Sequence, residues 1–216
     1  MNNTLTEGAG LNGLAFIGGE GPDAKTCAEL ALGAGLIAAA DAGLILAHNA
    51  GIRPAIIAGD MDSIDNLEIL KGYNSGCIIT YPHDKDLTDT EIVINLLLEK
   101  GCTAITIAGG GGGRMDHIFA LRDVFEREKK ITRWVTASED IYKVCGNFTA
   151  SVQSGATVSV FPCGDPPWKA ASKGLKWPLD NVAWKRNFFG ISNTALSDEI
   201  SIIAEKGAFI VIFEKI

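Results

Sequence analysis

Short apolar runs alternate with helix-like segments over the first two thirds of this chain. The runs have the length of buried strands, and we expect strands at Leu14–Gly18, Leu36–Ala40, Ala55–Gly59, Cys77–Tyr81, Thr103–Ala108 and Ile131–Val135. Strands that alternate with helices are typical of a parallel sheet covered by helices. The clearest helix signal is Thr88-Asp89-Thr90-Glu91, a capping-box pattern that opens the amphipathic run Ile92–Leu98, which ends at Gly101. The sequence therefore predicts an α/β domain.

A different pattern follows in the last third of the chain. Ala150–Phe161 alternates apolar and polar residues, Pro162–Trp168 resembles a loop, and Ile200–Glu214 is typical of a β-hairpin that turns at Glu205-Lys206-Gly207. These features predict a small antiparallel β domain. We therefore expect two domains, an α/β domain over residues 1–141 and a β domain over residues 142–216.

The composition narrows the class of protein. With 47% hydrophobic and 21% charged residues, this chain of 216 residues is predicted to fold around a core. A formal net charge of -7 argues against nucleic-acid binding, which requires a basic face. The five cysteines are scattered and odd in number, so we expect reduced thiols. The apolar stretch Gly35–Ala47 is interrupted by Asp41 and is too short to span a bilayer, and no basic segment precedes Lys25. The sequence thus predicts a cytoplasmic protein without a membrane anchor.

Acidic residues gather after three of the expected strands, at their carboxyl ends. They are Asp41 after the second strand, Asp60 and Asp62 after the third, and Asp84, Asp86 and Asp89 after the fourth. Ligands of open α/β sheets bind outside these ends, so the acidic side chains should converge in one crevice. In an extended loop, residues two apart face the same side, so Asp60 and Asp62 can together supply oxygen ligands to Mg²⁺. The sequence therefore predicts a magnesium site.

Simpler roles for these aspartates stay open. Asp62 and Ser63 have the chemistry of a turn and a helix cap, placed before a helix that we expect to begin near Ile64. Asp89 lies in the first turn of its helix, where the helix dipole favours an acidic residue. That role for Asp89 is compatible with metal binding.

A glycine run, Gly109–Gly113, lies between the fifth strand and a helix expected to start near Arg114. Bare backbone N–H groups and a helix N-terminus can approach phosphate closely, and Arg114 adds a charged contact. No Gly-Lys-Ser/Thr follows, so the run is not a Walker A loop, and a flexible surface loop has the same composition. For Asp116 and His117 in the helix, a cap and a solvated side chain are the simpler interpretation.

Other residue types give weaker signals. His48 and His83 stand alone in the sequence, and a lone histidine is more often a surface or core residue than a ligand. Trp168, Trp177 and Trp184 lie close together in the sequence; core packing explains them, and a stacking platform for a flat cationic ring is the alternative. No G-x-S-x-G motif is present, so we expect no nucleophile of the hydrolase type.

Taken in order, the motifs of this chain resemble those of the thiamine pyrophosphokinase (thiamine diphosphokinase) family. They are Ala40-Asp41-Ala42-Gly43, Gly59-Asp60-Met61-Asp62-Ser63-Ile64, Asp84-Lys85-Asp86-Leu87-Thr88-Asp89, Gly112-Gly113-Arg114-Met115-Asp116-His117, Gly174-Leu175-Lys176-Trp177-Pro178-Leu179 and Gly190-Ile191-Ser192-Asn193. Each motif is weak alone, but G-D-x-D-S-I followed by D-K-D-x-T-D and G-G-R-x-D-H is a specific combination. The resemblance covers nearly the whole chain.

This resemblance implies a fold and a reaction. The fold is an N-terminal α/β ATP-binding domain followed by a C-terminal β-sandwich that binds thiamine, in a homodimer whose active sites lie between subunits. In the reaction, the hydroxyl of thiamine attacks the β-phosphorus of ATP, which gives thiamine diphosphate and AMP. Transfer of this kind asks the protein for positioning and charge neutralisation rather than for a covalent nucleophile.

The resemblance also implies roles for individual residues. The residues implied for Mg²⁺ are Asp41, Asp60, Asp62 and Asp89, of which Asp60, Asp62 and Asp89 are the expected catalytic residues. The residues implied for ATP are Asp41, Lys85, Thr88, Gly112, Gly113, Arg114 and Asp116. The residues implied for thiamine are Trp177, Ser192 and Asn193. Either Asp62 or Asp89 is a candidate to accept the proton of the thiamine hydroxyl.

The chain departs from the family pattern in two places. The family commonly reads A-D-G-G-A-N where this chain has Ala42, Leu44 and Ile45, and Ala195 and Leu196 stand where an aromatic residue often follows the S-N pair. Two alternatives therefore stay open beside thiamine diphosphokinase. One is a pyrophosphokinase for another hydroxymethyl heterocycle, such as a pterin, and the other is a catalytically silent nucleotide-binding module.

Overall fold

The chain folds into two compact units, as seen in a computed structural model that describes residues 10–62 and 67–215. The first unit is Gly10–Ala137, and the second begins at Ser138. Each unit has a hydrophobic core of its own and is described by itself. The helix expected near Ile64, with Ser63 before it, lies outside the described residues.

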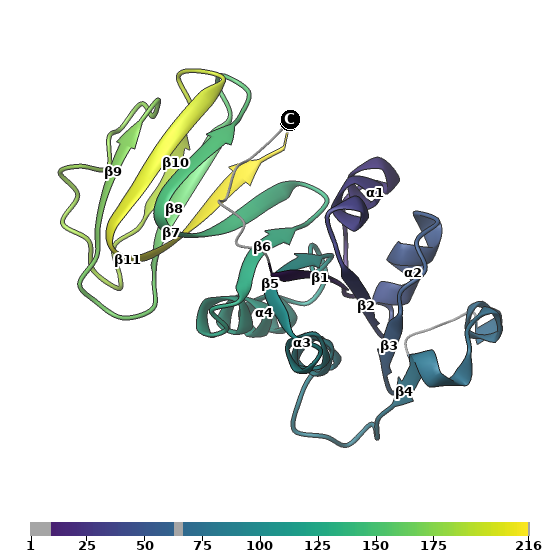
Figure 1. Cartoon of the computed structure of the whole chain (residues 1–216). Coiled ribbons are helices and arrows are strands. Elements are labelled where there is room, and N and C mark those ends of the chain that lie inside the picture. The colour runs from purple at the N-terminus through teal and green to yellow at the C-terminus, as the bar shows by residue number, and fades with distance from the viewer. Residues whose placement is uncertain (1–9, 63–66, 216) are drawn as a thin grey trace. The chain divides into compact units, whose positions relative to one another are not determined.

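A parallel sheet of six strands forms the centre of the first unit (Figure 1). The strands are β1 (Leu11–Phe16), β2 (Leu36–Ala40), β3 (Ile56–Gly59), β4 (Ile78–Thr80), β5 (Cys102–Ala108) and β6 (Ile131–Val135). Their order in the sheet is β6-β5-β1-β2-β3-β4, and neighbouring strands run in parallel. The predicted α/β fold class is confirmed, and every expected strand is present, although β1 begins at Leu11 rather than at Leu14.

Helices cover both faces of this sheet. Within the described residues they are α1 (Ala24–Leu32), α2 (Gly43–Asn49), α3 (Asp89–Glu99) and α4 (Met115–Arg127), with the short 3-10 helices η1 (Leu67–Gly72) and η2 (Ser75–Cys77) before β4. Helices α1 and α2 lie on one face, and α3 and α4 on the other (Figure 1). The predicted capping box of α3 is confirmed, since Thr88 Oγ1 accepts the Glu91 N–H at 3.2 Å and the Glu91 carboxylate accepts the Thr88 N–H at 2.9 Å. None of the described helices combines the length and apolar character needed to cross a bilayer.

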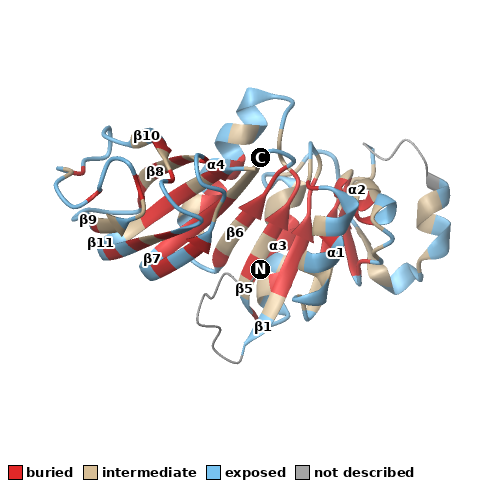
Figure 2. Cartoon of the chain, turned by 90° about the horizontal axis from the view of Figure 1, so that it is seen from above, coloured by how far each residue is buried: buried red, intermediate tan, exposed pale blue. Residues whose placement is uncertain are grey.

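The strand order changes direction beside β1. Strand β1 lies between β2 and β5, with β3 and β4 on one side and β6 on the other. The strands fill the interior (Figure 2); Leu14, Phe16 and Ile57 are no more than 1% exposed. A change of direction of this kind opens a crevice at the carboxyl ends of the strands, where ligands of α/β sheets bind.

The second unit is an antiparallel β structure, as the sequence predicts. Its strands are β7 (Glu139–Ser151), β8 (Thr157–Cys163), β9 (Lys169–Lys173), β10 (Gly190–Thr194) and β11 (Glu199–Glu214). Strand β11 pairs with β7 along its length, while β9 pairs with its first half and β8 with its second half; β10 pairs with β8. The long strands β7 and β11 therefore connect both halves of the unit.

The prediction of a hairpin over Ile200–Glu214 is wrong. These residues form the single strand β11, whose register shifts between Ala204 and Phe209, with Gly207 at a φ of 72°. Both halves of β11 pair with β7, so the residues between them bulge out instead of reversing the chain. The bend lets Ile202 and Phe209, from the two halves, pack in one core cluster.

The alternating segment Ala150–Phe161 spans parts of two strands. Strand β7 ends at Ser151 and β8 begins at Thr157. Gly155, at a φ of 93°, lies in the turn between them. Pro162, expected in a loop, lies near the end of β8.

Candidate functional site

Three aspartates from separate loops meet at the carboxyl ends of β2 and β3. Asp41 directly follows β2, Asp60 directly follows β3, and Asp89 is the first residue of α3. One carboxylate oxygen from each of the three lies within 4.8 Å of the others. Asp41 is only 7% exposed, so its charge is largely shielded from bulk water. The structure thus brings together three of the four aspartates expected to bind metal, here called the aspartate cluster.

Gly59 allows the aspartate cluster to form. Its φ of 152° lies in a region that residues with side chains rarely adopt. A Cβ atom at this position would lie 3.0 Å from Asp41 Cβ and 3.2 Å from Asp89 Oδ1. The glycine of the G-D-x-D motif therefore makes room for Asp41 and Asp89 to approach each other.

Asp62 lies beside Asp60 but closer to solvent. Met61 between them has a φ of 63°, in the left-handed region, so the loop is not extended as expected, yet one carboxylate oxygen of each aspartate lies within 4.8 Å of the other and of a His83 ring nitrogen. The side chain of Asp60 is 11% exposed, whereas that of Asp62 is 54% exposed. The Asp62 N–H donates to Asp60 Oδ1 at 3.3 Å. Asp62 therefore lies at the solvent edge of the aspartate cluster.

Lys85 provides positive charge inside this region. Its Nζ lies 3.3 Å from Asp60 Oδ2 and 3.2 Å from Asp89 Oδ1, and its side chain is 14% exposed. Burial works against the ammonium charge, but hydrogen bonds to Asp89 and Asp60 outweigh it and raise the pKa of Lys85. Lys85 is therefore a charged group in a fixed position beside the aspartates.

His83 also lies at the aspartate cluster, although it stands alone in the sequence. Its Nδ1 is 2.9 Å from Asp60 Oδ2 and 3.3 Å from Asp62 Oδ2. The hydrogen bond from His83 holds the pKa of Asp60 well below its usual range, and the same bond raises the pKa of His83. His83 is a surface residue, as expected for a lone histidine, but it also contacts two of the aspartates. The signal that could have identified this contact is its position just beyond β4, at the same sheet edge as Asp60.

The charges in this region favour a bound cation. The four aspartates bring four negative charges, and Lys85 and a protonated His83 offset two of them. Like charges at this spacing repel one another unless a cation lies among them. Carboxylate oxygens are also the ligands that Mg²⁺ and related hard cations prefer. The residues present therefore fit a divalent cation.

The glycine run packs against the segment that follows β1. The N–H groups of its first three glycines donate to the carbonyl oxygens of Val135, Gly18 and Glu20 at 2.9 to 3.0 Å. A Cβ atom on any of these three glycines would come within 2.7 Å of a neighbouring atom. The run is thus a packed loop, which leaves Gly112 and Gly113, among the described residues, with N–H groups not bonded to a protein carbonyl.

Arg114 and Asp116 form an exposed ion pair where the glycine run meets α4. Arg114 Nε donates to Asp116 Oδ1 at 3.1 Å, and the same oxygen accepts the His117 N–H at 3.0 Å. The hydrogen bond from Arg114 lowers the pKa of Asp116. Arg114 directly follows Gly112 and Gly113 in the sequence, so the pair lies at the end of the loop that carries their N–H groups.

In the second unit, Asn193 holds the backbone of Trp177. The Asn193 side chain is buried, and its Oδ1 accepts the N–H groups of Trp177 at 3.1 Å and of Thr194 at 2.8 Å. Its Nδ2 donates to the carbonyl oxygen of Trp177 at 2.7 Å. Two of the three residues expected to contact thiamine therefore contact each other.

Ser192, the third of these residues, has an unusual backbone conformation. Its φ is 57°, and its N–H donates to Ser159 Oγ at 3.2 Å. Asp41 and Met61 are the other non-glycine residues with positive φ among those described. Such conformations are uncommon, and they gather at functional sites. All three lie at or next to a residue expected in the site.

Core packing explains some of the three tryptophans, and an exposed stacking platform fits another. Trp184 packs in the core of the second unit, with its ring centroid 5.0 Å from that of Phe209. The Trp168 ring is tied to the backbone, because its Nε1 donates to the Cys163 carbonyl oxygen at 2.9 Å. Trp177 is 54% exposed and is the one of the three with a ring that is mainly open to solvent.

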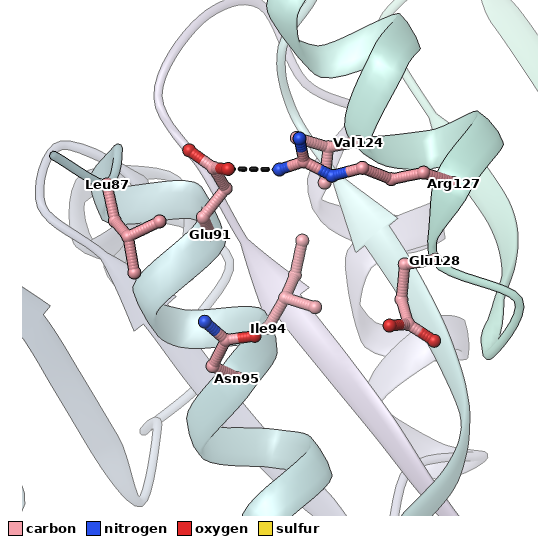
Figure 3. Close-up of a pocket in the computed structure, with 7 residues that line it drawn as sticks. All are labelled: Leu87, Glu91, Ile94, Asn95, Val124, Arg127 and Glu128. Carbon is pink, nitrogen blue, oxygen red and sulfur yellow. Dashed lines mark hydrogen bonds and ion pairs between the residues drawn. The ribbon is translucent and has the colours of Figure 1, made fainter.

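A separate hollow of about 320 Å³ lies between α3 and α4 (Figure 3). It is lined by Leu87, Glu91, Ile94, Asn95, Val124, Arg127 and Glu128. The Glu91 carboxylate pairs with the Arg127 guanidinium across it (Figure 3). Burial opposes the charge of Glu91, but hydrogen bonds from Thr88 and Arg127 outweigh it and lower the pKa of Glu91. The hollow contains no member of the aspartate cluster, and its ion pair joins the two helices.

Family models match both parts of the chain. The model described as "Thiamin pyrophosphokinase, catalytic domain" matches residues 27–134, and the model described as "Thiamin pyrophosphokinase, vitamin B1 binding domain" matches residues 147–209. Together they cover most of the sequence.

Curated relatives with the same description are found in plants. The protein called thiamine pyrophosphokinase 1 of Arabidopsis thaliana is 32% identical over 158 residues, which cover 66% of this chain and 58% of that protein. Its namesake in Oryza sativa subsp. japonica is 30% identical over 146 residues, which cover 61% of this chain and 54% of that protein. The chain thus spans somewhat more than half the length of these relatives.

Solved structures share the fold over nearly the whole chain. The thiamine pyrophosphokinase of Bacillus subtilis superposes with a TM-score of 0.75 at 24% identity, covering 94% of this chain and 99% of that one. The thiamin pyrophosphokinase of Candida albicans gives a TM-score of 0.72 at 17% identity, covering 95% and 89% of the two chains. Because the two chains are only 24% and 17% identical to this one, the similarity shows a shared fold and nothing more.

Proposed function

Because this chain belongs to the thiamin pyrophosphokinase family, we propose that it transfers the pyrophosphoryl group of ATP to the hydroxyl of thiamine. The products are thiamine diphosphate and AMP. The observation that carries this proposal is the aspartate cluster with Lys85 beside it, at the carboxyl ends of the parallel strands. Transfer of this kind depends on positioning and on charge neutralisation, and this arrangement is suited to both.

We assign the divalent cation of the reaction as Mg²⁺. The carboxylates of Asp41, Asp60 and Asp89 would hold it, with Asp62 at the solvent edge. When bound, the cation supplies charge neutralisation for the phosphate oxygens of ATP. Lys85 contributes a second, permanent positive charge to the same phosphates.

The remaining phosphate contacts are assigned to the start of α4. The N–H groups of Gly112 and Gly113 and the guanidinium of Arg114 are available to anionic oxygens, and Asp116 orients that guanidinium. Thr88 belongs to the same nucleotide side, where it fixes the start of α3. The proton of the thiamine hydroxyl has two candidate acceptors, Asp62 and Asp89.

Thiamine is assigned to the second domain, residues 142–216, and ATP to residues 1–141. In the second domain, Trp177, Ser192 and Asn193 form the thiamine side of the site, where the exposed Trp177 ring suits a flat heterocycle. The homodimer implied by the family resemblance and the cytoplasmic location stay predictions of the sequence.

A direct test is an assay of the purified chain with ATP, Mg²⁺ and thiamine, in which AMP and thiamine diphosphate are separated by chromatography. We expect equal amounts of both products, and neither after addition of EDTA. Formation of ADP would contradict pyrophosphoryl transfer. Product formation with another hydroxymethyl heterocycle but not with thiamine would reassign the acceptor.

The role of the aspartate cluster is tested by Asp60→Asn. This change keeps the shape of the side chain and removes the charge that lies between Lys85 and His83. We expect turnover to fall by about 100-fold or more. Asp165→Asn, at an exposed position in the second unit, is the matched control and should leave turnover unchanged. Near-normal turnover in the Asp60 variant would refute the assignment of the site.

A further inference from the structure

The hydrogen bonds of Asn193 are directed at the protein backbone. Its Oδ1 accepts two N–H groups, from Trp177 and Thr194, and its Nδ2 donates to the Trp177 carbonyl oxygen. These bonds use the two lone pairs of Oδ1 and one of the two hydrogens on Nδ2. The residue is 5% exposed. An amide that is buried and engaged in this way is poorly placed to bind a substrate directly.

Trp177 combines a fixed backbone with an open ring. Asn193 bonds both backbone polar groups of Trp177, and the adjacent Lys176 N–H donates to the Thr194 carbonyl oxygen at 2.9 Å. The residue is 54% exposed, and the Lys176 Nζ lies 4.6 Å from the centroid of its ring. Indole rings are large apolar groups that stack on other flat rings in an offset arrangement. The structure therefore fixes the backbone from which an exposed aromatic ring extends.

We propose that Asn193 is a positioning residue: it holds Trp177, the ring that the proposed function already places against a flat heteroaromatic ring of the acceptor. This inference rests on the proposed function, which supplies thiamine as an acceptor that contains such rings. The S-N motif implies that Asn193 contacts the substrate directly. In this inference Asn193 acts on the substrate only through Trp177.

The physical reason is preorganisation. A backbone that is already fixed leaves only the side-chain torsions of Trp177 to be ordered when a ligand binds, so more of the stacking energy appears as affinity. Without Asn193, the Trp177 backbone loses both of its bonds to that side chain, and the ring can leave the stacking position. The loss should therefore weaken acceptor binding and leave ATP binding unchanged.

The test is a double-mutant cycle of Asn193→Ala and Trp177→Ala, read out as the Kd for thiamine by calorimetry and as the KM values for thiamine and ATP. We expect Trp177→Ala to raise the Kd and KM for thiamine by about tenfold or more, as loss of a stacking ring does elsewhere. Asn193→Ala should raise them by a smaller factor. The double variant should match Trp177→Ala alone, because a residue that acts through Trp177 has no effect once the ring is absent. The KM for ATP should stay within about twofold of the wild-type value.

Ser172→Ala is the matched control. Ser172 Oγ accepts the Leu179 N–H at 3.0 Å, so this change removes a bond of the same kind from the same segment without touching Trp177. It should leave the thiamine Kd unchanged. If Asn193→Ala does not fold, Asn193→Ser replaces it, because the shorter hydroxyl stays neutral and polar but cannot bond both backbone groups of Trp177 at once. That variant should show a smaller rise in the thiamine Kd.

Two results would overturn the inference. One is an unchanged thiamine Kd in Trp177→Ala, and the other is full multiplication of the two single effects in the double variant, which would indicate direct contact of Asn193 with thiamine. In both cases a wild-type chain that forms thiamine diphosphate keeps the proposed function intact. A wild-type chain that neither binds nor converts thiamine would refute both.

Discussion

Thr88 links the stability of the first unit to the geometry of the aspartate cluster. Its Oγ1 accepts the Glu91 N–H at 3.2 Å and donates to Glu91 Oε2 at 2.8 Å. Its own N–H donates to the same carboxylate at 2.9 Å. The helix capped in this way is α3, whose first residue, Asp89, is a member of the aspartate cluster. A change at Thr88 should therefore affect both folding and cation binding.

The change Thr88→Ala removes the two hydroxyl bonds and keeps the bond of the N–H. Loss of an N-cap side chain typically costs about 1 kcal/mol, within a range of about 0.5–2 kcal/mol. Removal of the second bond, to the charged Glu91 carboxylate, lowers the stability further. Thr88 is exposed, however, so water replaces part of the lost hydrogen bonding. We expect the free energy of unfolding to fall by about 1–1.5 kcal/mol, which lowers Tm by about 2–6 °C in a chain of this size.

Thr88→Ser keeps the hydroxyl and is the matched control. Unfolding in urea measures stability, and calorimetry with Mg²⁺ measures cation affinity. We expect Thr88→Ala to be less stable and to bind Mg²⁺ more weakly, and Thr88→Ser to stay close to the wild-type chain in both. If Thr88→Ala unfolds like the wild-type chain but shows a strongly raised KM for ATP, the hydroxyl contacts the nucleotide and the reasoning from the cap is wrong.

Two further changes test the same region. Gly59→Ala places a methyl group against Asp41 and Asp89 at a φ that strongly favours glycine, so we expect a loss of about 1–3 kcal/mol in unfolding and weakened Mg²⁺ binding by calorimetry. Gly76→Ala, where a Cβ atom meets open space, should change neither. The pKa of Glu91 is lowered in the fold, so its stabilising effect is present at neutral pH and is lost as the pH falls through that pKa. The unfolding free energies of the wild-type chain and Glu91→Gln should therefore converge in acid, and a difference independent of pH would contradict this assignment.

The sheet and the aspartate cluster could be predicted because both follow from local signals. The length and apolar composition of each run identify parallel strands, and parallel strands end at the same edge of a sheet. An acidic residue placed just after such a strand is therefore brought close to those that follow its neighbours. Asp41, Asp60 and Asp89 meet for this reason.

Features that depend on a distant partner could not be predicted in this way. No local motif identifies His83, because its partner Asp60 lies 23 positions away in the sequence, outside the spacing of such motifs. The sequence predicts a turn at Gly207. Strand β7 pairs with β11 on both sides of this glycine, so β11 continues in one direction and does not turn back. A glycine with positive φ is compatible with a hairpin and with a bulge, and only the partner strand decides between them.

The G-D-x-D motif shows why spacing alone gives an incomplete site. Two acidic residues two positions apart are equivalent ligands if the backbone between them is extended. Here Met61 has a φ of 63°, which directs Asp60 towards the interior and Asp62 towards solvent, with side chains 11% and 54% exposed. The Asp60 carboxylate is largely buried beside Lys85 and His83, whereas the Asp62 carboxylate reaches the same histidine from the solvent side. The two aspartates of one motif are therefore not equivalent ligands, because a cation between them would meet one buried carboxylate and one that water also reaches.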